Sequence, residues 1–248
     1  MPKVTLEQKE TLAVLRLTNG VTNPISPELV EELLKAVRQV KEENLGLVLA
    51  GGTKFFSIGL DLPILLALNR DEMKEFWDNL IQAVFELYTF PLPTACAIAG
   101  HAPAGGTVLA LACDYRFAAS GRKLIGLNEV KLGLPVPQIT DSIMRQIVGD
   151  REATELLYQG DLIEPARAQQ IGLVDEIHPL EEVEDRAVEK IAKLAALPHP
   201  ALTAIKANRV EAVRLTYEKN KEIKNQEFLD CWFSQPVQEL LAKTAEKF

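Results

Sequence analysis

The chain has 248 residues, of which 47% are hydrophobic and 25% charged, and its formal net charge is -8. A chain of this length can bury a sizeable core, as one large domain or as one domain with an appendage. Its acidic balance argues against a non-specific nucleic-acid binder, which normally carries a basic patch. Cys96, Cys113 and Cys231 are widely spaced and form no CxxC pair, so they support neither a disulfide framework nor a zinc site.

Polar and apolar residues alternate at the N-terminus, as in a strand and unlike a signal peptide. No apolar stretch reaches the roughly 20 residues that a membrane span requires. We therefore expect a cytoplasmic protein without a transit peptide.

The first elements predicted along the chain alternate between strands and helices. Residues 3–17 predict a hairpin, and the next helix begins after Ser26, which is a good N-cap, with Pro27 at its first position. A buried strand is predicted over 45–52 and a helix over 76–87. They are followed by a strand at 94–99, a short helix at 105–112 and a strand at 115–118. This order favours an α/β fold.

Beyond about residue 140 the sequence becomes helical. Asp150 is predicted to cap a helix that ends at Gly160, and Pro165 begins the next. From residue 181 the pattern is helical with a break at 197–200. We place a soft boundary near residue 196, which divides the chain into a core of residues 1–195 and a helical region of residues 196–248. The helical region has only modest apolar faces, so it is expected to pack on the core or on another subunit.

Two glycine-containing segments are candidates for binding a ligand through backbone N–H groups. In FFSIGLDL, 55–62, Gly59 allows a tight turn that leaves the amide of Leu60 free. In PAGGTVLALAC, Ala104, Gly105 and Gly106 bring the backbone close to a ligand at the start of a helix. The alternatives to ligand binding are that Gly59 is an ordinary loop glycine and that the small residues at 104–106 allow close helix packing. Two donors from separate loops would suit an oxyanion hole.

An oxyanion hole needs a base nearby, and Glu129 is the best candidate. It lies among apolar residues in LIGLNEVKLGLPVP, where loss of solvent would raise its pKa and make it a competent base. The alternative is an exposed glutamate followed by Lys131. A serine hydrolase is disfavoured because GxSxG is absent and Ser57 has no histidine in such a context. His101, beside the glycine loop, is a further possible ligand contact.

Taken in order, several segments resemble the crotonase (enoyl-CoA hydratase/isomerase) superfamily over about residues 4–210. They are NPISPELVEEL, GLDL, AIAGHAPAGGTVLALACDYRFAA, NEVKLGL and GDREATELLYQGDLIEPARAQQIGLVDEI. The resemblance implies a spiral of ββα units with a C-terminal helical region used in trimerisation, hence a homotrimer or a dimer of trimers. It also implies an acyl-CoA thioester substrate, with coenzyme A as part of the substrate. No separate cofactor, metal, nucleic acid or membrane partner is expected.

The resemblance assigns the oxyanion hole to the amides of Leu60 and Gly105. Hydratases of this superfamily use two glutamates, whereas here Val108 takes the first position and Glu129 the second. Because a valine side chain forms no hydrogen bond, the pair favours a Δ3,Δ2-enoyl-CoA isomerase, in which Glu129 moves a proton from C2 to C4. HAPAGG and GLNEVKLG look most like the mitochondrial type of that enzyme. The open alternatives are an enoyl-CoA hydratase or another crotonase-type hydrolase or lyase, and a non-catalytic CoA-binding subunit.

Further residues are predicted to bind substrate from their places in these motifs: Ser57, Gly59, Asp61, Ala104, Gly106, Val108 and Asn128. The acyl pocket is expected along residues 62–90 and 132–145. Lys54 and the C-terminal lysines are the candidates for contacts to the CoA phosphates.

Overall fold

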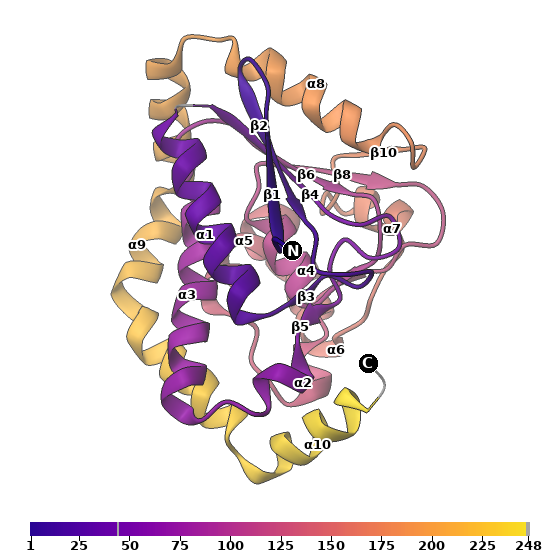
Figure 1. Cartoon of the computed structure of the whole chain (residues 1–248), viewed down its shortest axis with the longest axis vertical. Coiled ribbons are helices and arrows are strands. Elements are labelled where there is room, and N and C mark those ends of the chain that lie inside the picture. The colour runs from indigo at the N-terminus through magenta and orange to yellow at the C-terminus, as the bar shows by residue number, and fades with distance from the viewer. Residues whose placement is uncertain (44, 247–248) are drawn as a thin grey trace.

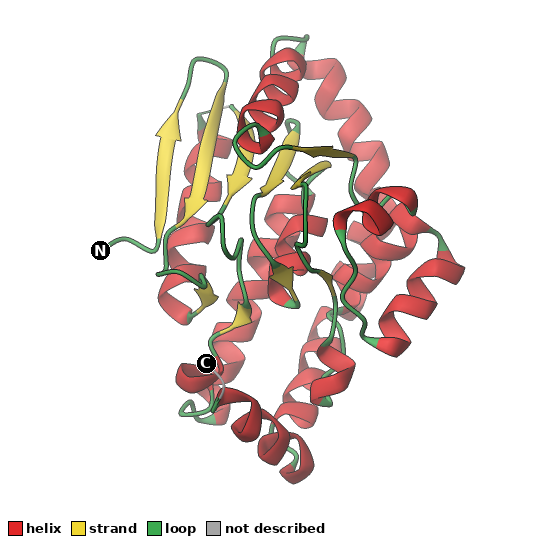
Figure 2. Cartoon of the chain, turned by 90° about the vertical axis from the view of Figure 1, so that its right-hand side faces the viewer, coloured by secondary structure: helices red, strands yellow, loops and turns green. Residues whose placement is uncertain are grey.

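A computed structural model describes residues 1–43 and 45–246, and a mostly parallel six-stranded sheet lies at its centre (Figure 2). Its strands lie in the order β1, β2, β4, β6, β8, β10. Only β1 and β2, the predicted hairpin, pair antiparallel. The bounds are β1 Val4–Gln8, β2 Leu12–Leu17, β4 Gly46–Ala50, β6 Thr94–Ile98, β8 Tyr115–Ala119 and β10 Glu176–His178.

Four two-residue strands form two further parallel pairs. β3 (Pro24–Ile25) pairs with β5 (Gly59–Leu60), and β7 (Ala102–Pro103) pairs with β9 (Ile125–Gly126). β2, β4, β6 and β8 are each followed by a short strand and then by a helix, whereas β10 leads directly to α8. These repeated ββα units confirm the predicted α/β fold, and they bring the loops after successive long strands together.

The helices confirm several predicted starts and correct two others. α1 begins at Pro27, where Ser26 Oγ accepts a hydrogen bond from Leu29 N at 3.3 Å. α3 begins at Arg70, earlier than predicted, because Asn69 and Glu72 form a capping box. The prediction that Asp150 caps α6 is wrong: Gly149 is the N-cap and Asp150 the first helical residue. The bounds are α1 Pro27–Glu42, α2 Leu62–Leu65, α3 Arg70–Tyr88, α4 Gly105–Leu111, the 3-10 helix η1 Glu129–Leu132, α5 Gln138–Val148, α6 Asp150–Gln159, α7 Pro165–Gln170 and α8 Val183–Ala195.

The middle strands of the sheet, β4 and β6, are buried on both faces. Val48 and Ala50 of β4 point to the face that α8 covers, where they pack with Ile191. Leu47 and Leu49 point to the opposite face and join the larger core. Successive side chains of a strand point to opposite faces, so a strand covered on both sides must be apolar throughout. Figure 1 shows α8 above the sheet, and α1 and α3 side by side on its other side.

Two C-terminal helices pack back on the same chain. α9 (His199–Trp232) runs along α3 and α5, and α10 (Gln235–Ala245) lies against α2 and η1 (Figure 1). Asp114 accepts hydrogen bonds from Lys206 and Arg209 of α9, and Phe228 of α9 stacks on Trp77 of α3. These contacts agree with the expected packing on the core, while the boundary at residue 196 stays a prediction. Within residues 1–43 and 45–246, no helix has the length and apolar character needed to cross a membrane.

Candidate functional site

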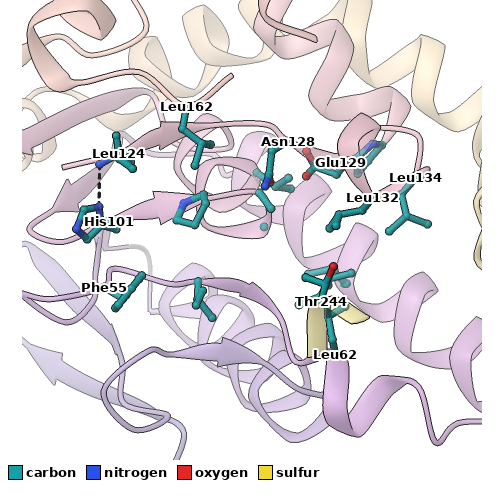
Figure 3. Close-up of a pocket in the computed structure, with 18 of the residues that line it drawn as sticks. Phe55, Leu62, His101, Leu124, Asn128, Glu129, Leu132, Leu134, Leu162 and Thr244 are labelled. Carbon is teal, nitrogen blue, oxygen red and sulfur yellow. Dashed lines mark hydrogen bonds between the residues drawn. The ribbon is translucent and has the colours of Figure 1, made fainter. Parts of the chain in front are cut away.

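A cavity of about 440 Å³ lies where β5, the start of α4 and η1 meet (Figure 3). Phe55, His101 and Leu124 lie toward one end, and Leu62, Leu134 and Thr244 toward the other. The lining is predominantly apolar, as in most small-molecule sites. Glu129 is the single carboxylate among the described residues that line it.

The amide of Leu60 is the first of the two predicted backbone donors, and Leu60 lines this cavity. Gly59 N donates a hydrogen bond to Ser57 Oγ at 3.2 Å, and Asp61 N donates to Ile25 O of β3 at 3.1 Å. Successive amides of a strand point to opposite sides. The Leu60 N–H therefore points away from β3, and Leu60 itself lines the cavity.

The amide of Gly105 is the second donor, and a strained backbone presents it. Ala104, the N-cap of α4, has φ 47° and ψ -120°, and its side chain caps no amide of the first turn. Such a conformation in a residue other than glycine costs about 1–3 kcal/mol and is commonest at functional sites. A Cβ atom built on Gly59 would lie 3.3 Å from Gly105 N. The two predicted donors, Leu60 and Gly105, thus belong to backbone segments in direct contact.

Glu129 supplies a group that can gain and lose a proton near neutral pH. Its side chain begins η1 and is 8% exposed, and Oε2 has no hydrogen-bond partner among the described residues. Burial raises the pKa of the carboxyl to about 7, against the weaker effect of a hydrogen bond from its own backbone. A base whose pKa lies near the working pH transfers protons most effectively.

Glu129 is expected to make the protein less stable as the pH rises. Its pKa is about 7 in the folded state and near the ordinary 4.5 in the unfolded chain. Between these values the folded state holds a proton that the unfolded state has lost, so stability falls as the pH increases. At about 1.4 kcal/mol per unit the loss is about 3 kcal/mol. In urea denaturation, we compare the free energy of unfolding of Glu129→Gln with that of the native protein. The difference should shift by about 3 kcal/mol in favour of the variant between about pH 4 and pH 8. A pH-independent difference would contradict this.

Val108 and Asn128 are two further predicted residues that line the cavity. Val108 of α4 is 4% exposed and lines the cavity with a side chain that can neither accept nor donate a hydrogen bond. Asn128 also lines it, and its buried Oδ1 has no partner among the described residues. The polar side chains among the described residues that line the cavity are therefore those of Glu129, Asn128, His101 and Thr244.

The predicted site residues divide into a group that lines the cavity and a group behind it. Ser57 is fully buried and donates a hydrogen bond to Asn23 O at 2.7 Å. Asp61 caps α2 by accepting from Ile64 N at 3.4 Å, and Gly106 packs against Ser57 O. With Gly59, these residues shape the loops. The predicted residues that line the cavity are Leu60, Ala104, Gly105, Val108, Asn128 and Glu129.

The predicted acyl-pocket segments contribute to the lining, together with residues that sequence reasoning missed. The predicted ranges supply Leu62, Trp77, Leu80, Leu132, Leu134 and Pro137. Phe228 and Thr244 come from α9 and α10, which no local pattern connects with the glycine loops. The signal for Phe228 was its place, with Trp232, on a buried helical face.

His101 is part of the lining as an uncharged ring. Its Nδ1 accepts a hydrogen bond from Leu124 N at 3.0 Å, and the ring packs against Phe55. Partial burial, assisted by the nearby charges of Lys123 and Arg122, lowers its pKa. Two cations therefore lie close to this end of the cavity.

Known proteins similar to this chain include enoyl-CoA isomerases and hydratases. Human mitochondrial enoyl-CoA delta isomerase 1 is 32% identical over 220 residues, which cover 86% of this chain and 73% of the human protein. A putative enoyl-CoA hydratase of Thermus thermophilus is 37% identical over 182 residues, or 70% of this chain and 71% of that protein. The crystal structure of human mitochondrial delta3-delta2-enoyl-CoA isomerase superposes with a TM-score of 0.94 at 30% identity, covering 99% of this chain and 97% of that one.

The sequence profile described as enoyl-CoA hydratase/isomerase matches residues 7–248, nearly the whole chain. Together with the repeated ββα units and the relatives above, this match shows that the chain belongs to the enoyl-CoA hydratase/isomerase family.

Proposed function

We propose that the protein is a Δ3,Δ2-enoyl-CoA isomerase, which moves a C=C bond of an acyl-CoA thioester from position 3 to position 2. One observation carries the proposal: among the described residues that line an apolar cavity Glu129 is the single carboxylate, and Val108 lies where the resemblance places a second acid in hydratases. Moving a double bond requires one base that later acts as an acid. Adding water requires a held water molecule and a proton delivered to carbon.

The proposed reaction uses Glu129 twice. As a carboxylate it removes the proton from C2, and the C–H electrons pass into a dienolate whose negative charge rests on the thioester oxygen. The amides of Leu60 and Gly105 hold that oxygen. Protonated Glu129 then gives the proton to C4, which leaves the double bond between C2 and C3. A pKa near 7 serves both half-reactions, since neither protonation state of the carboxyl is strongly disfavoured.

The charges around the cavity support a direction for the bound substrate. Arg122 and Lys123 lie near His101, at the end away from Leu62 and Leu134. Lys54 belongs to the same region, where its carbonyl accepts a hydrogen bond from His101 N at 3.0 Å. In our proposal the CoA phosphates lie at this end of the cavity, and the acyl chain extends toward Leu62 and Leu134.

The proposal is tested by offering the purified protein a 3-enoyl-CoA and following formation of the conjugated 2-enoyl-CoA. The expected result is turnover with kcat within the usual enzyme range of about 1 to 1000 per second. Tight binding of the thioester without any conversion would contradict an isomerase and favour a CoA-binding subunit.

Hydration is the second candidate, because the Thermus relative of 37% identity is described as a putative enoyl-CoA hydratase. A hydratase would have to position its water without help from Val108, whose side chain offers no hydrogen bond, and would depend on Glu129, main-chain groups and Asn128. Measuring isomerisation and hydration with the same purified protein separates the two activities.

We also propose that the protein acts as a homotrimer or a dimer of trimers in fatty acid β-oxidation. Support for self-association comes from large apolar side chains exposed along α9. They are Ile205, Leu215 and Ile223.

A further inference from the structure

A second cavity, of about 360 Å³, adjoins the inner end of the first. It lies among α3, α5, α6 and α9, on the side of the first cavity away from His101. Four of the residues that line the first cavity also line the second, so their side chains form the wall between the two cavities. They are Trp77, Leu134, Pro137 and Phe228.

Two stacked rings form the central part of this wall. Trp77 of α3 and Phe228 of α9 face each other with ring centroids 3.3 Å apart and planes 2° from parallel. Both side chains are buried. They belong to helices joined by side-chain contacts such as the hydrogen bond from Asn225 Nδ2 to Asp78 Oδ1 at 2.7 Å.

We propose that the Trp77–Phe228 pair limits the acyl chain length, and that the second cavity receives the ends of longer chains when the two rings part. The inference rests on the proposed function. A thioester held at the Leu60 and Gly105 amides, with its CoA toward His101, directs its chain past Glu129 toward the stacked rings. The surfaces along that path are apolar, with Leu80, Leu132 and Leu134 among them.

The second cavity offers a chain end two different surroundings. Near the wall it is lined by Ile81, Ile139 and Leu157, which are buried apolar side chains. Farther out are Asp141 and Lys221. A methyl end is stabilised along the apolar part and loses that stabilisation where the charged groups begin, so the second cavity extends the range of chain lengths by a limited amount.

The test is binding of saturated acyl-CoAs, from hexanoyl-CoA to octadecanoyl-CoA, by isothermal titration calorimetry. These thioesters cannot react, so binding is measured independently of turnover. Each methylene that leaves water strengthens binding about fourfold. In the native protein the affinity should rise with chain length and then level off at the ring wall. In Trp77→Ala the rise should continue over at least two more carbons, a gain of about 15-fold for the longer chains.

Two matched variants and one milder variant make the result interpretable. Leu80→Ala enlarges the first cavity only, and Ile81→Ala enlarges the second only. In both variants the affinity should stop rising within one carbon of the chain length at which it levels off in the native protein. Phe228→Leu removes one ring of the stack while keeping an apolar side chain, and it should shift the limit as Trp77→Ala does, even where the larger truncation unfolds the protein.

An unchanged chain-length limit in folded Trp77→Ala and Phe228→Leu would overturn the inference while leaving the proposed function intact. A shift of equal size in Leu80→Ala would also overturn it, because the limit would then not depend on the Trp77–Phe228 pair in particular. Failure of every acyl-CoA to bind the native protein would instead overturn the proposed function itself.

Discussion

Replacement of Glu129 by glutamine is expected to lower kcat for isomerisation by about 100- to 10,000-fold, the range for loss of a general acid–base group. Glutamine has nearly the same shape but neither takes a proton from C2 nor gives one to C4. Glu129 is the only carboxylate among the described residues that line the cavity, so no neighbour replaces it. The substitution leaves the amides of Leu60 and Gly105, the proposed thioester contacts, unchanged, so KM should change much less than kcat.

A glutamate outside the site provides the control. Glu164 is exposed before α7 and its side chain caps no amide there, so Glu164→Gln should keep native activity. The native enzyme should also lose kcat/KM as the pH falls below about 7, since its base becomes protonated. Near-native turnover in Glu129→Gln would refute the role of Glu129.

Gly59→Ala is expected to lower kcat by about 100- to 1000-fold, as loss of an oxyanion-hole donor does. Gly59 has φ +99°, and a new Cβ would lie 3.1 Å from Ala104 Cβ and 3.3 Å from Gly105 N. Contacts this tight push apart the segments that carry the two donors. Because the change touches no titratable group, the pH dependence of kcat/KM should stay as in the native enzyme.

Gly20→Ala is the matched control for Gly59→Ala. Gly20 also has a positive φ, +70°, but a Cβ there would have no neighbour within 4 Å. It reproduces the backbone strain without the contact to the α4 loop. An equally large loss of kcat in Gly20→Ala would show that backbone strain, and not displacement of the donors, explains the loss in Gly59→Ala.

The elements that the sequence predicted best carry their own local signals. Ser26 and Pro27 mark the start of α1, and the apolar run at 45–52 contains β4, whose two faces are both covered. The start of α3 was missed because its capping box of Asn69 and Glu72 lies in a polar stretch before the apolar repeat. The two-residue strands, such as β3, have no periodicity of their own and are held by tertiary pairing.

The site shows the same division. Glu129 and the Gly59 and Gly105 segments were recognisable from apolar surroundings and small residues near helix starts. The positive φ of Ala104 was not, since a sequence pattern assigns such a conformation to glycine first. Phe228 was not placed in the cavity either, because it reaches the glycine loops only through the packing of α9 on α3.

The most direct test of the central claim is to measure isomerisation of a 3-enoyl-CoA and hydration of the corresponding 2-enoyl-CoA with the same purified protein. Since Glu129 is the one acid among the described residues that line the cavity, kcat/KM for isomerisation should exceed that for hydration by at least about 100-fold, the smallest usual contribution of one acid–base group. Hydration as fast as isomerisation, or faster, would contradict the account.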